Sequence, residues 1–230
     1  MPAYNLTPRK VPHVQTKYRR IKTAIPVPDD QPILQTLRKY EPESLSGQPP
    51  IVWDRAEGFQ VYDAHGNMWL DFSAGVLVAN AGHSAPEICK ALEEQIHRGL
   101  LHNYCFPSAL RARLVERLVS VAPRPLDKCF LLTTGSEAVE NCLKVARAYG
   151  HKTGGGRKVG WVSFERAFHG RTLGAQMVGG IPALKAWIGN LDPDCWQVPF
   201  PDGFRTTDTR FELFLESLKA AGVGPDRICA

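Results

Sequence analysis

The chain has 230 residues, of which 43% are hydrophobic and 22% charged, an ordinary globular composition with enough length for a sizeable buried core. Six of its 28 basic residues precede Asp29, the first acidic residue, so the remainder holds 22 basic and 23 acidic residues and has a net charge of about −1. A near-neutral body argues against nucleic-acid binding, and no apolar run approaches the roughly 20 residues that cross a bilayer. We therefore expect a cytoplasmic protein that binds neither nucleic acid nor a membrane.

Residues 1–50 are predicted to form an N-terminal arm and connector. They are rich in proline and charge, and their pattern favours one short helix from 32 to 40. A basic, acid-free start is also typical of a transit peptide, but four prolines among the first 26 residues interrupt any amphipathic helix, and the first 43 residues contain no serine. We expect an extended arm that lies on the body of the protein or on a partner subunit.

Residues 51–85 are predicted to form an antiparallel meander and a link, which belong to a small N-terminal α+β domain. Three short strands are expected, joined by turns that contain Gly58 and Gly66. The expected strands are 51–53, 59–62 and 68–71.

Residues 86–230 are predicted to form the first part of a large domain. Helical spacing of apolar residues and then an alternation of strands and helices indicate an α/β fold, with a mostly parallel sheet flanked by helices. The expected elements are helices 86–98 and 108–121, strand 128–133, helix 136–149, a glycine loop at 154–156, strand 158–163, a further helix and strand, and a last helix from 210 to 221.

The six cysteines include no C-x-x-C pair and have no histidine at metal-ligand spacing. We therefore expect reduced thiols, no disulfide framework and no metal site.

The segment Thr133–Ala138, which we call the phosphate cup, lies between an apolar run and a stretch with helical spacing. A helix N-terminus offers free backbone N–H groups and partial positive charge, which suit a phosphate. Gly135 allows a tight turn, and Ser136 can cap the helix or bind phosphate through its hydroxyl. A plain serine cap is the alternative, since a valine rather than an acidic residue follows Ser136 at the capping-box position.

A second informative segment, residues 163–172, follows the expected strand 158–163 and reaches the edge of the sheet where α/β proteins bind ligands. Phe168 can stack on an aromatic ring, Gly170 allows close backbone approach, and Arg171 offers a bidentate fork for a carboxylate. Taken singly, Phe168 is also consistent with a core residue, and Arg171 with a solvated surface residue. Together, at the same sheet edge as the phosphate cup, they predict a ligand site.

Thr133–Asn141 reads Thr-Thr-Gly-Ser-Glu-Ala-Val-Glu-Asn and Phe168–Thr172 reads Phe-His-Gly-Arg-Thr, while Gly58–Asp63 and Gly75–His83 supply further motifs in the same order. From about Trp53 to its last residue the chain resembles the class-III pyridoxal-phosphate aminotransferases, and most closely their 4-aminobutyrate branch. The resemblance implies the pyridoxal-phosphate-dependent transferase fold, fold type I, in a truncated form.

The resemblance also implies roles for single residues. The cofactor is pyridoxal 5'-phosphate, and the residues that bind it are Gly135, Ser136, Phe168 and His169. Arg171 matches the arginine that binds the substrate carboxylate in the 4-aminobutyrate branch, and Val76 falls where that branch lines the substrate pocket. Glu137 and Glu140 are assigned to helix-start electrostatics and subunit contacts rather than to chemistry.

We expect no catalytic residue within this chain. The family forms a Schiff base with a lysine that lies further along its sequence, after an acidic strand-end motif, and we expect that lysine beyond residue 230. Lys144 is expected about two helical turns from the phosphate, and the other lysines of this region flank strands away from it. We therefore expect the chain to be the N-terminal part of a longer enzyme and inactive alone.

The implied activity is transfer of an amino group from an amino acid to a 2-oxo acid. An ω-amino acid such as 4-aminobutyrate is the expected donor, and a homodimer or dimer of dimers is the expected assembly. Two alternatives stay open: a racemase, aminomutase or decarboxylating transaminase with the same fold, or a non-catalytic domain that binds a phosphate ligand.

Overall fold

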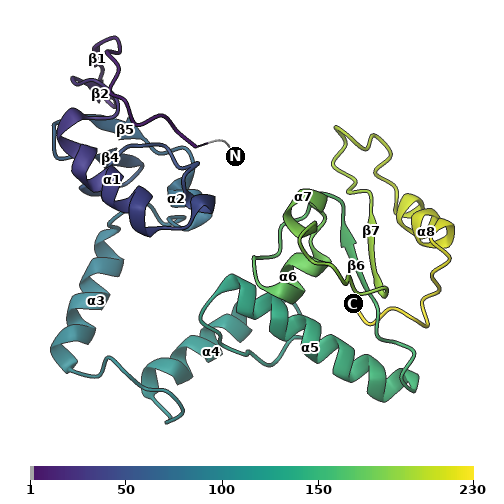
Figure 1. Cartoon of the computed structure of the whole chain (residues 1–230). Helices are drawn as coiled ribbons and strands as arrows, with labels where there is room; N and C mark the ends of the chain where they lie inside the picture. Colours follow the sequence, from purple (N-terminus) through teal and green to yellow (C-terminus); the bar gives the residue numbers. More distant parts are fainter. Residues whose placement is uncertain (1–2) are drawn as a thin grey trace. The chain divides into compact units, whose positions relative to one another are not determined.

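The computed structural model describes residues 3–230, and it divides into two compact units, one that ends at Ser108 and one that spans Ala109–Ala230 (Figure 1). Each unit is described by itself. None of the helices in residues 3–230 has both the length and the apolar character of a membrane span. The division into an arm, a meander and a large domain, with boundaries after residues 50 and 85, stays a prediction.

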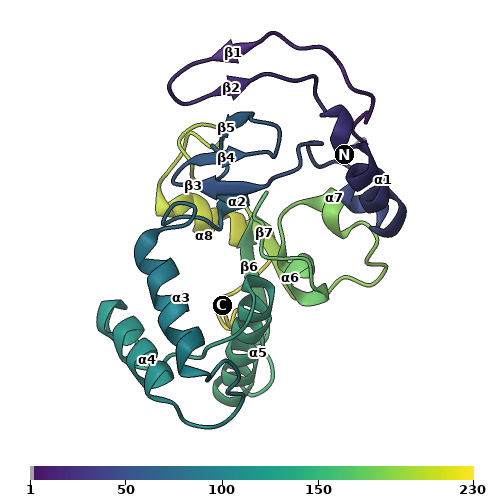
Figure 2. The same cartoon turned by 90° about the vertical axis from the view of Figure 1, so that its left-hand side faces the viewer.

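The first unit is built on a five-stranded antiparallel sheet with the order β1-β2-β5-β4-β3, whose strands lie side by side in Figure 2. Val61 and Met68 are buried in it. The expected meander is present, but its first strand lies at 55–57 rather than 51–53. The strands are β1 Val14–Gln15, β2 Arg20–Ile21, β3 Arg55–Glu57, β4 Gln60–Tyr62 and β5 Met68–Leu70.

Part of the predicted arm therefore belongs to the sheet, which the sequence pattern did not show. Arg20 pairs with Met68, and its Nε donates to the carbonyl of Gly66 at 2.7 Å. The Lys22 amide donates to Oδ1 of the fully buried Asn67 at 2.7 Å. Since Asn67 has no access to water, the Lys22 bond satisfies its side-chain oxygen, and the two bonds together fix the arm to the turn before β5.

The helices predicted over 32–40 and 86–98 are both present in the first unit, at Gln31–Tyr40 and Pro86–Arg98. The predicted helix 86–98 is present with the same bounds, since Pro86 is tolerated in the first turn and Gly99 ends the helix with a left-handed φ of 73°. The helical segments are η1 Pro28–Asp30, α1 Gln31–Tyr40, η2 Glu43–Leu45, α2 Ala74–Leu77 and α3 Pro86–Arg98.

The second unit contains the parallel pair that the sequence predicts. β6 and β7 run parallel, Gly160 forms a further parallel bridge to Ile228, and Val198 and Leu218 are buried in the core that covers them. The elements are α4 Ala109–Val121, α5 Gly135–Gly154, β6 Trp161–Phe164, α6 Leu173–Val178, α7 Pro182–Lys185, β7 Cys195–Val198 and α8 Phe211–Ala220.

Two predicted elements of this unit differ from the structure. Residues 128–133 are extended but form no strand, because no strand within residues 3–230 bonds to them, and Phe130 is 68% exposed. The helix expected over 136–149 begins at Gly135 and continues to Gly154. Gly155 ends it with a left-handed φ of 60°, so the glycine loop is shorter than expected.

Candidate functional site

The phosphate cup is the start of α5, and its cap differs from the expected one. Thr134, not Ser136, is the N-cap: its Oγ1 accepts the Glu137 amide at 3.1 Å. The Glu137 carboxylate in turn accepts the amides of Thr133 and Thr134, at 3.1 and 3.0 Å. A capping box is therefore present, and its cap lies two residues before the predicted one. This bonding leaves Ser136 available for another role.

The first turn of α5 fits a phosphate group. Within the described part of the chain, the amides of Gly135 and Ser136 form no hydrogen bond. Gly135 is exposed, and a Cβ built on it would meet no atom within 4 Å. Two unpaired N–H groups at the positive end of a 20-residue helix, with open space at Gly135, form a suitable anion site.

The structure brings the second predicted segment onto this helix start. Gly170 is buried against Ser136, and a Cβ added to it would lie 2.3 Å from the serine Oγ. The Arg171 amide donates to the same Oγ at 3.2 Å. Because a hydroxyl can accept this bond and still donate its own proton, Ser136 stays able to bind a phosphate oxygen.

Glu140 joins the two segments from the next turn of α5. Its Oε1 accepts the Thr172 hydroxyl at 2.6 Å and the amides of Gly174 and Ala175 at 2.9 and 3.1 Å. These are N-terminal N–H groups of α6, which lies beside α5 in Figure 1. Sequence reasoning missed this contact; the spacing that puts Glu140 one turn after Ser136, on the same helix face, was the available signal.

The loop from β6 to α6 is held by its backbone. The Arg166 amide donates to the carbonyl of Gly180 at 2.7 Å, and the Gly180 amide donates to Ala167 at 2.9 Å. A Cβ on Gly180 would lie 2.0 Å from the carbonyl oxygen of Phe164, so only glycine permits this approach. The loop therefore reaches the phosphate cup in one defined conformation.

The side chains of this loop stay available to a ligand. Phe168 is 60% exposed, and Arg171 is exposed. In the described residues the His169 ring and the Arg171 guanidinium form no hydrogen bond or ion pair. An aromatic face, an imidazole and a guanidinium thus lie next to an anion site.

Val76 lies in the first unit, in an unusual turn. Ala74, Gly75, Val76 and Leu77 all have positive φ, of 49°, 61°, 63° and 67°. The short helix α2 is thus wound left-handed. This conformation costs an L-residue roughly 1–2 kcal/mol, so the three non-glycine residues together store about 3–6 kcal/mol. Strain of this size persists only where the surrounding structure holds it.

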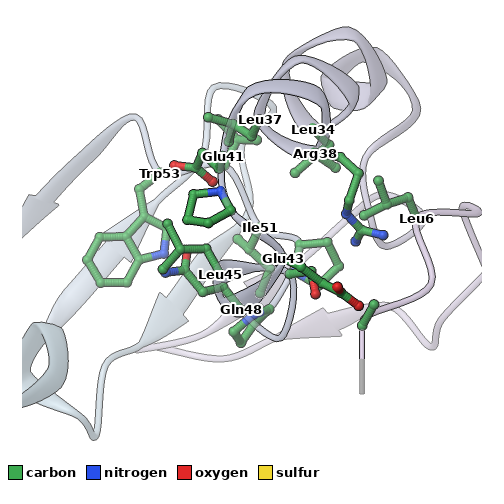
Figure 3. Close-up of a pocket in the computed structure, with 16 residues that line it drawn as sticks. Leu6, Leu34, Leu37, Arg38, Glu41, Glu43, Leu45, Gln48, Ile51 and Trp53 are labelled. Carbon is green, nitrogen blue, oxygen red and sulfur yellow. The ribbon is translucent and has the colours of Figure 1, made fainter. Parts of the chain in front are cut away.

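A pocket of about 560 Å³ in the first unit contains none of the predicted site residues (Figure 3). It lies between α1 and the segment that leads to Trp53, with Leu34 and Ile51 among its apolar walls. The guanidinium at its rim, from Arg38, already donates to the carbonyl of Tyr4 at 3.1 Å. Its walls also carry polar side chains, among them Glu41, Glu43 and Gln48, so the pocket is lined by apolar and polar groups alike.

Comparison with known proteins identifies the class. Residues 43–230 match the family model of aminotransferase class-III, and the chain belongs to this family. It is 38% identical over 166 residues to the mitochondrial acetylornithine aminotransferase of Yarrowia lipolytica. That match covers 70% of this chain and 40% of the Yarrowia protein, so the chain spans less than half the length of this relative.

Solved transaminases share the fold. The (S)-enantioselective omega-transaminase of Thermomicrobium roseum is 27% identical with a TM-score of 0.73, over 86% of this chain and 48% of that one. The taurine:2-oxoglutarate aminotransferase of Bifidobacterium kashiwanohense, solved with PLP and glutamate, is 25% identical with a TM-score of 0.72, over 86% of this chain and 46% of that one. The prediction of fold type I is therefore confirmed, for a chain that spans about half the length of these structures.

Proposed function

We propose that the full-length protein is a pyridoxal-phosphate-dependent aminotransferase that moves an amino group from an amino acid to a 2-oxo acid. One observation carries this proposal: the contact between Gly170 and Ser136 packs the Phe168–Arg171 segment onto the first turn of α5, beside the free amides of the phosphate cup. Membership of the class-III family and the similarity to solved transaminases support it.

In this proposal the residues of the second unit bind and orient the cofactor. The amides of Gly135 and Ser136, with the Ser136 hydroxyl, hold the phosphate. Phe168 covers one face of the pyridine ring, and His169 lies beside it. When bound, pyridoxal phosphate supplies an electron sink for the carbon that loses its proton. Arg171 fixes the substrate carboxylate by a charge-assisted bidentate pair.

No residue of this chain is proposed to move the proton. The family lysine that does so is expected beyond residue 230, and that expectation stays a prediction. The residues described above bind and position; they do not replace that lysine.

We propose an ω-amino acid such as 4-aminobutyrate as the donor. Arg171 supports a donor whose carboxylate lies away from the reacting amine. The 38% identity to a protein named acetylornithine aminotransferase favours N-acetylornithine as a second candidate donor. Both molecules carry a terminal amine and a distant carboxylate, which is the chemistry that Arg171 would recognise.

The full-length protein should be assayed with 2-oxoglutarate and each donor, with glutamate formation as the measurement. We expect Arg171→Ala to lower kcat/KM for 4-aminobutyrate roughly 10- to 100-fold, because it removes hydrogen bonds to a charged group. Butylamine, which lacks the carboxylate, is the matched control, and Arg171→Ala should leave its kcat/KM unchanged. Loss of the cofactor's visible absorption in Arg171→Ala would contradict the assigned role, and absence of any glutamate would contradict the function.

We further propose a homodimer or dimer of dimers, located in the cytoplasm; the Yarrowia relative is named a mitochondrial protein. Apolar residues of α3 support an assembly, since Ile88, Leu92 and Ile96 are 51%, 59% and 60% exposed. Light scattering coupled to gel filtration measures the mass, and a monomer at micromolar concentration would contradict the proposal.

A further inference from the structure

His65 lies in the turn between β4 and β5, and carboxylates of η1 lie at both of its ring nitrogens. Nε2 lies 2.9 Å from Oδ1 of Asp30, and Nδ1 lies 4.0 Å from Oδ2 of Asp29. The His65 side chain is 23% exposed, and that of Asp30 is only 8% exposed. A neutral imidazole carries one N–H, whereas the imidazolium carries two. Only the protonated ring therefore presents an N–H to both carboxylates.

The buried carboxylate of Asp30 depends on His65. Within residues 3–230 it has the His65 ring as its one hydrogen-bond partner, and a buried carboxylate that loses its partner is costly. The pair formed by His83 and Asp71, at 2.7 Å in the same unit, is built differently. Asp71 also accepts the amide and the hydroxyl of Ser73, at 3.0 and 2.6 Å. Hydrogen bonds from Ser73 and then His83 hold the pKa of Asp71 well below its usual range. Asp71 thus keeps a partner without its imidazole, and Asp30 does not.

The bond between His65 and Asp30 joins the end of the N-terminal arm to the sheet. Asp30 is the last residue of η1 and the N-cap of α1. The turn that carries His65 is itself fixed, because Oδ1 of the buried Asp63 accepts the amides of His65 and Asn67, both at 2.9 Å. Opening of the bond would therefore release η1 and the start of α1, and leave the turn in place.

Acidic groups from two elements face the His65 ring. Asp29 and Asp30 belong to η1, and Asp63 directly follows β4; Arg20 of β2 binds the same turn through its Nε. The hydrogen bond to Asp30 raises the pKa of His65, burial opposes this rise, and the charges of the three carboxylates add to it. The stability that a raised pKa provides is fully present below the unfolded value of about 6.5, and it is lost as the pH rises through the folded value.

We propose that His65, Asp29 and Asp30 form a pH-dependent latch, which holds η1 and the start of α1 on the β4–β5 turn and loosens as the pH rises through neutrality. The latch lies wholly within the first unit, and it does not depend on the proposed aminotransferase function. It responds over the pH range in which histidine changes its charge. The end of the arm is the part that it releases.

Hydrogen exchange of the full-length protein at pH 6 and pH 8 tests the latch. The protection factors of residues 29–37 are compared after correction for the intrinsic exchange rate at each pH. They should fall roughly fivefold at pH 8, because the imidazolium forms a stronger hydrogen bond to a carboxylate than the neutral ring does. The amides of α3, in the same unit, are the internal reference and should keep their protection.

Three variants assign the pH dependence to the latch. His65→Gln keeps an N–H for Asp30 but takes up no proton, so the protection of residues 29–37 should be the same at both pH values. Asp29→Asn removes the second carboxylate and should reduce the pH dependence without abolishing it. The matched control is His13→Gln: His13 lies on the same arm, is exposed and forms no hydrogen bond in the described residues, so the wild-type pH dependence should remain. If His65→Gln does not fold, Asp30→Asn is judged by the same measurement and should also lose the pH dependence.

Equal protection of residues 29–37 at pH 6 and pH 8 in the wild type would overturn the latch. A pH dependence that persists in His65→Gln, or in Asp30→Asn where that variant replaces it, would also overturn the latch, because another group would then be responsible. A loss of protection at pH 8 that extends to α3 would overturn it as well, since the change would involve the whole unit.

Discussion

Gly170→Ala should disrupt the contact between the Phe168–Arg171 segment and Ser136 in the first turn of α5. The new Cβ would lie 2.3 Å from Oγ, 2.9 Å from Cβ and 3.0 Å from Cα of Ser136, and the backbone at Gly170 has a φ of 127°. Such a φ costs an L-residue roughly 1–3 kcal/mol, and overpacking of a tight contact costs roughly another 1–3 kcal/mol. We therefore expect a loss of about 2–6 kcal/mol in the free energy of unfolding.

The assay is urea unfolding of the full-length protein, together with a titration of pyridoxal phosphate followed by its visible absorption. The dissociation constant of pyridoxal phosphate should rise at least roughly tenfold, because a loss of 1.4 kcal/mol in binding free energy corresponds to one factor of ten. Gly189→Ala is the matched control: a Cβ there meets nothing within 4 Å, and the change in unfolding free energy should stay within about 0.5 kcal/mol.

The same substitution should also be made in the Ser136→Ala protein. In Ser136→Ala the contact with Oγ disappears, while the contacts with Cβ and Cα remain. The cost of Gly170→Ala should therefore fall in that background without vanishing. Wild-type stability and cofactor affinity in Gly170→Ala itself would refute the proposed packing of the loop on the helix start.

Three further predictions concern the groups around the site. Glu140→Ala should lower the free energy of unfolding by about 2–4 kcal/mol, because the amides of α6 that it accepts lose their partner, while Glu140→Gln keeps an acceptor and should cost less than half of that in the same urea assay. Asp71 has a lowered pKa, so its ionised form stabilises the fold above about pH 4 and this stability is lost as the pH falls further; the stability difference between wild type and Asp71→Asn should shrink over that acid range. Burial raises the pKa of the Cys195 thiol, so mass spectrometry after iodoacetamide treatment should show roughly tenfold slower alkylation there than at the exposed Cys105.

Helices were the most predictable part of the fold, because their ends carry local signals. The helix predicted over 86–98 has these bounds, with Pro86 in its first turn and Gly99 directly after its end. The start of α5 was placed wrongly, since Ser136 after a glycine looked like a cap while the true pair, Thr134 and Glu137, begins earlier. Residues 128–133 carry a strand pattern, but a strand also needs a bonded neighbour, which local pattern cannot supply.

The site was predictable in its parts and not in its contacts. The sequence pattern predicts that residues 168–171 and the phosphate cup share one edge of the sheet, and the structure joins them at Ser136. The role of Glu140 depends on a hydroxyl and two amides that lie 32–35 residues away along the chain, which no local pattern indicates. The left-handed turn at Val76 was hidden for another reason: alanine, valine and leucine have no preference for positive φ, so only its surroundings create it.

The phosphate end of the site is rigid for reasons internal to the second unit. Gly180 fixes the loop before Phe168, Gly170 fixes its contact with Ser136, and Glu140 fixes the start of α6 beyond it. Each of these contacts joins residues of the same unit, so none requires bound substrate. The exposed side chains of Phe168 and Arg171 depend on them for position but gain no partner from them. Cofactor affinity should therefore be sensitive to substitutions at Gly170, Gly180 and Glu140, whereas substitutions at Arg171 should act on donor choice.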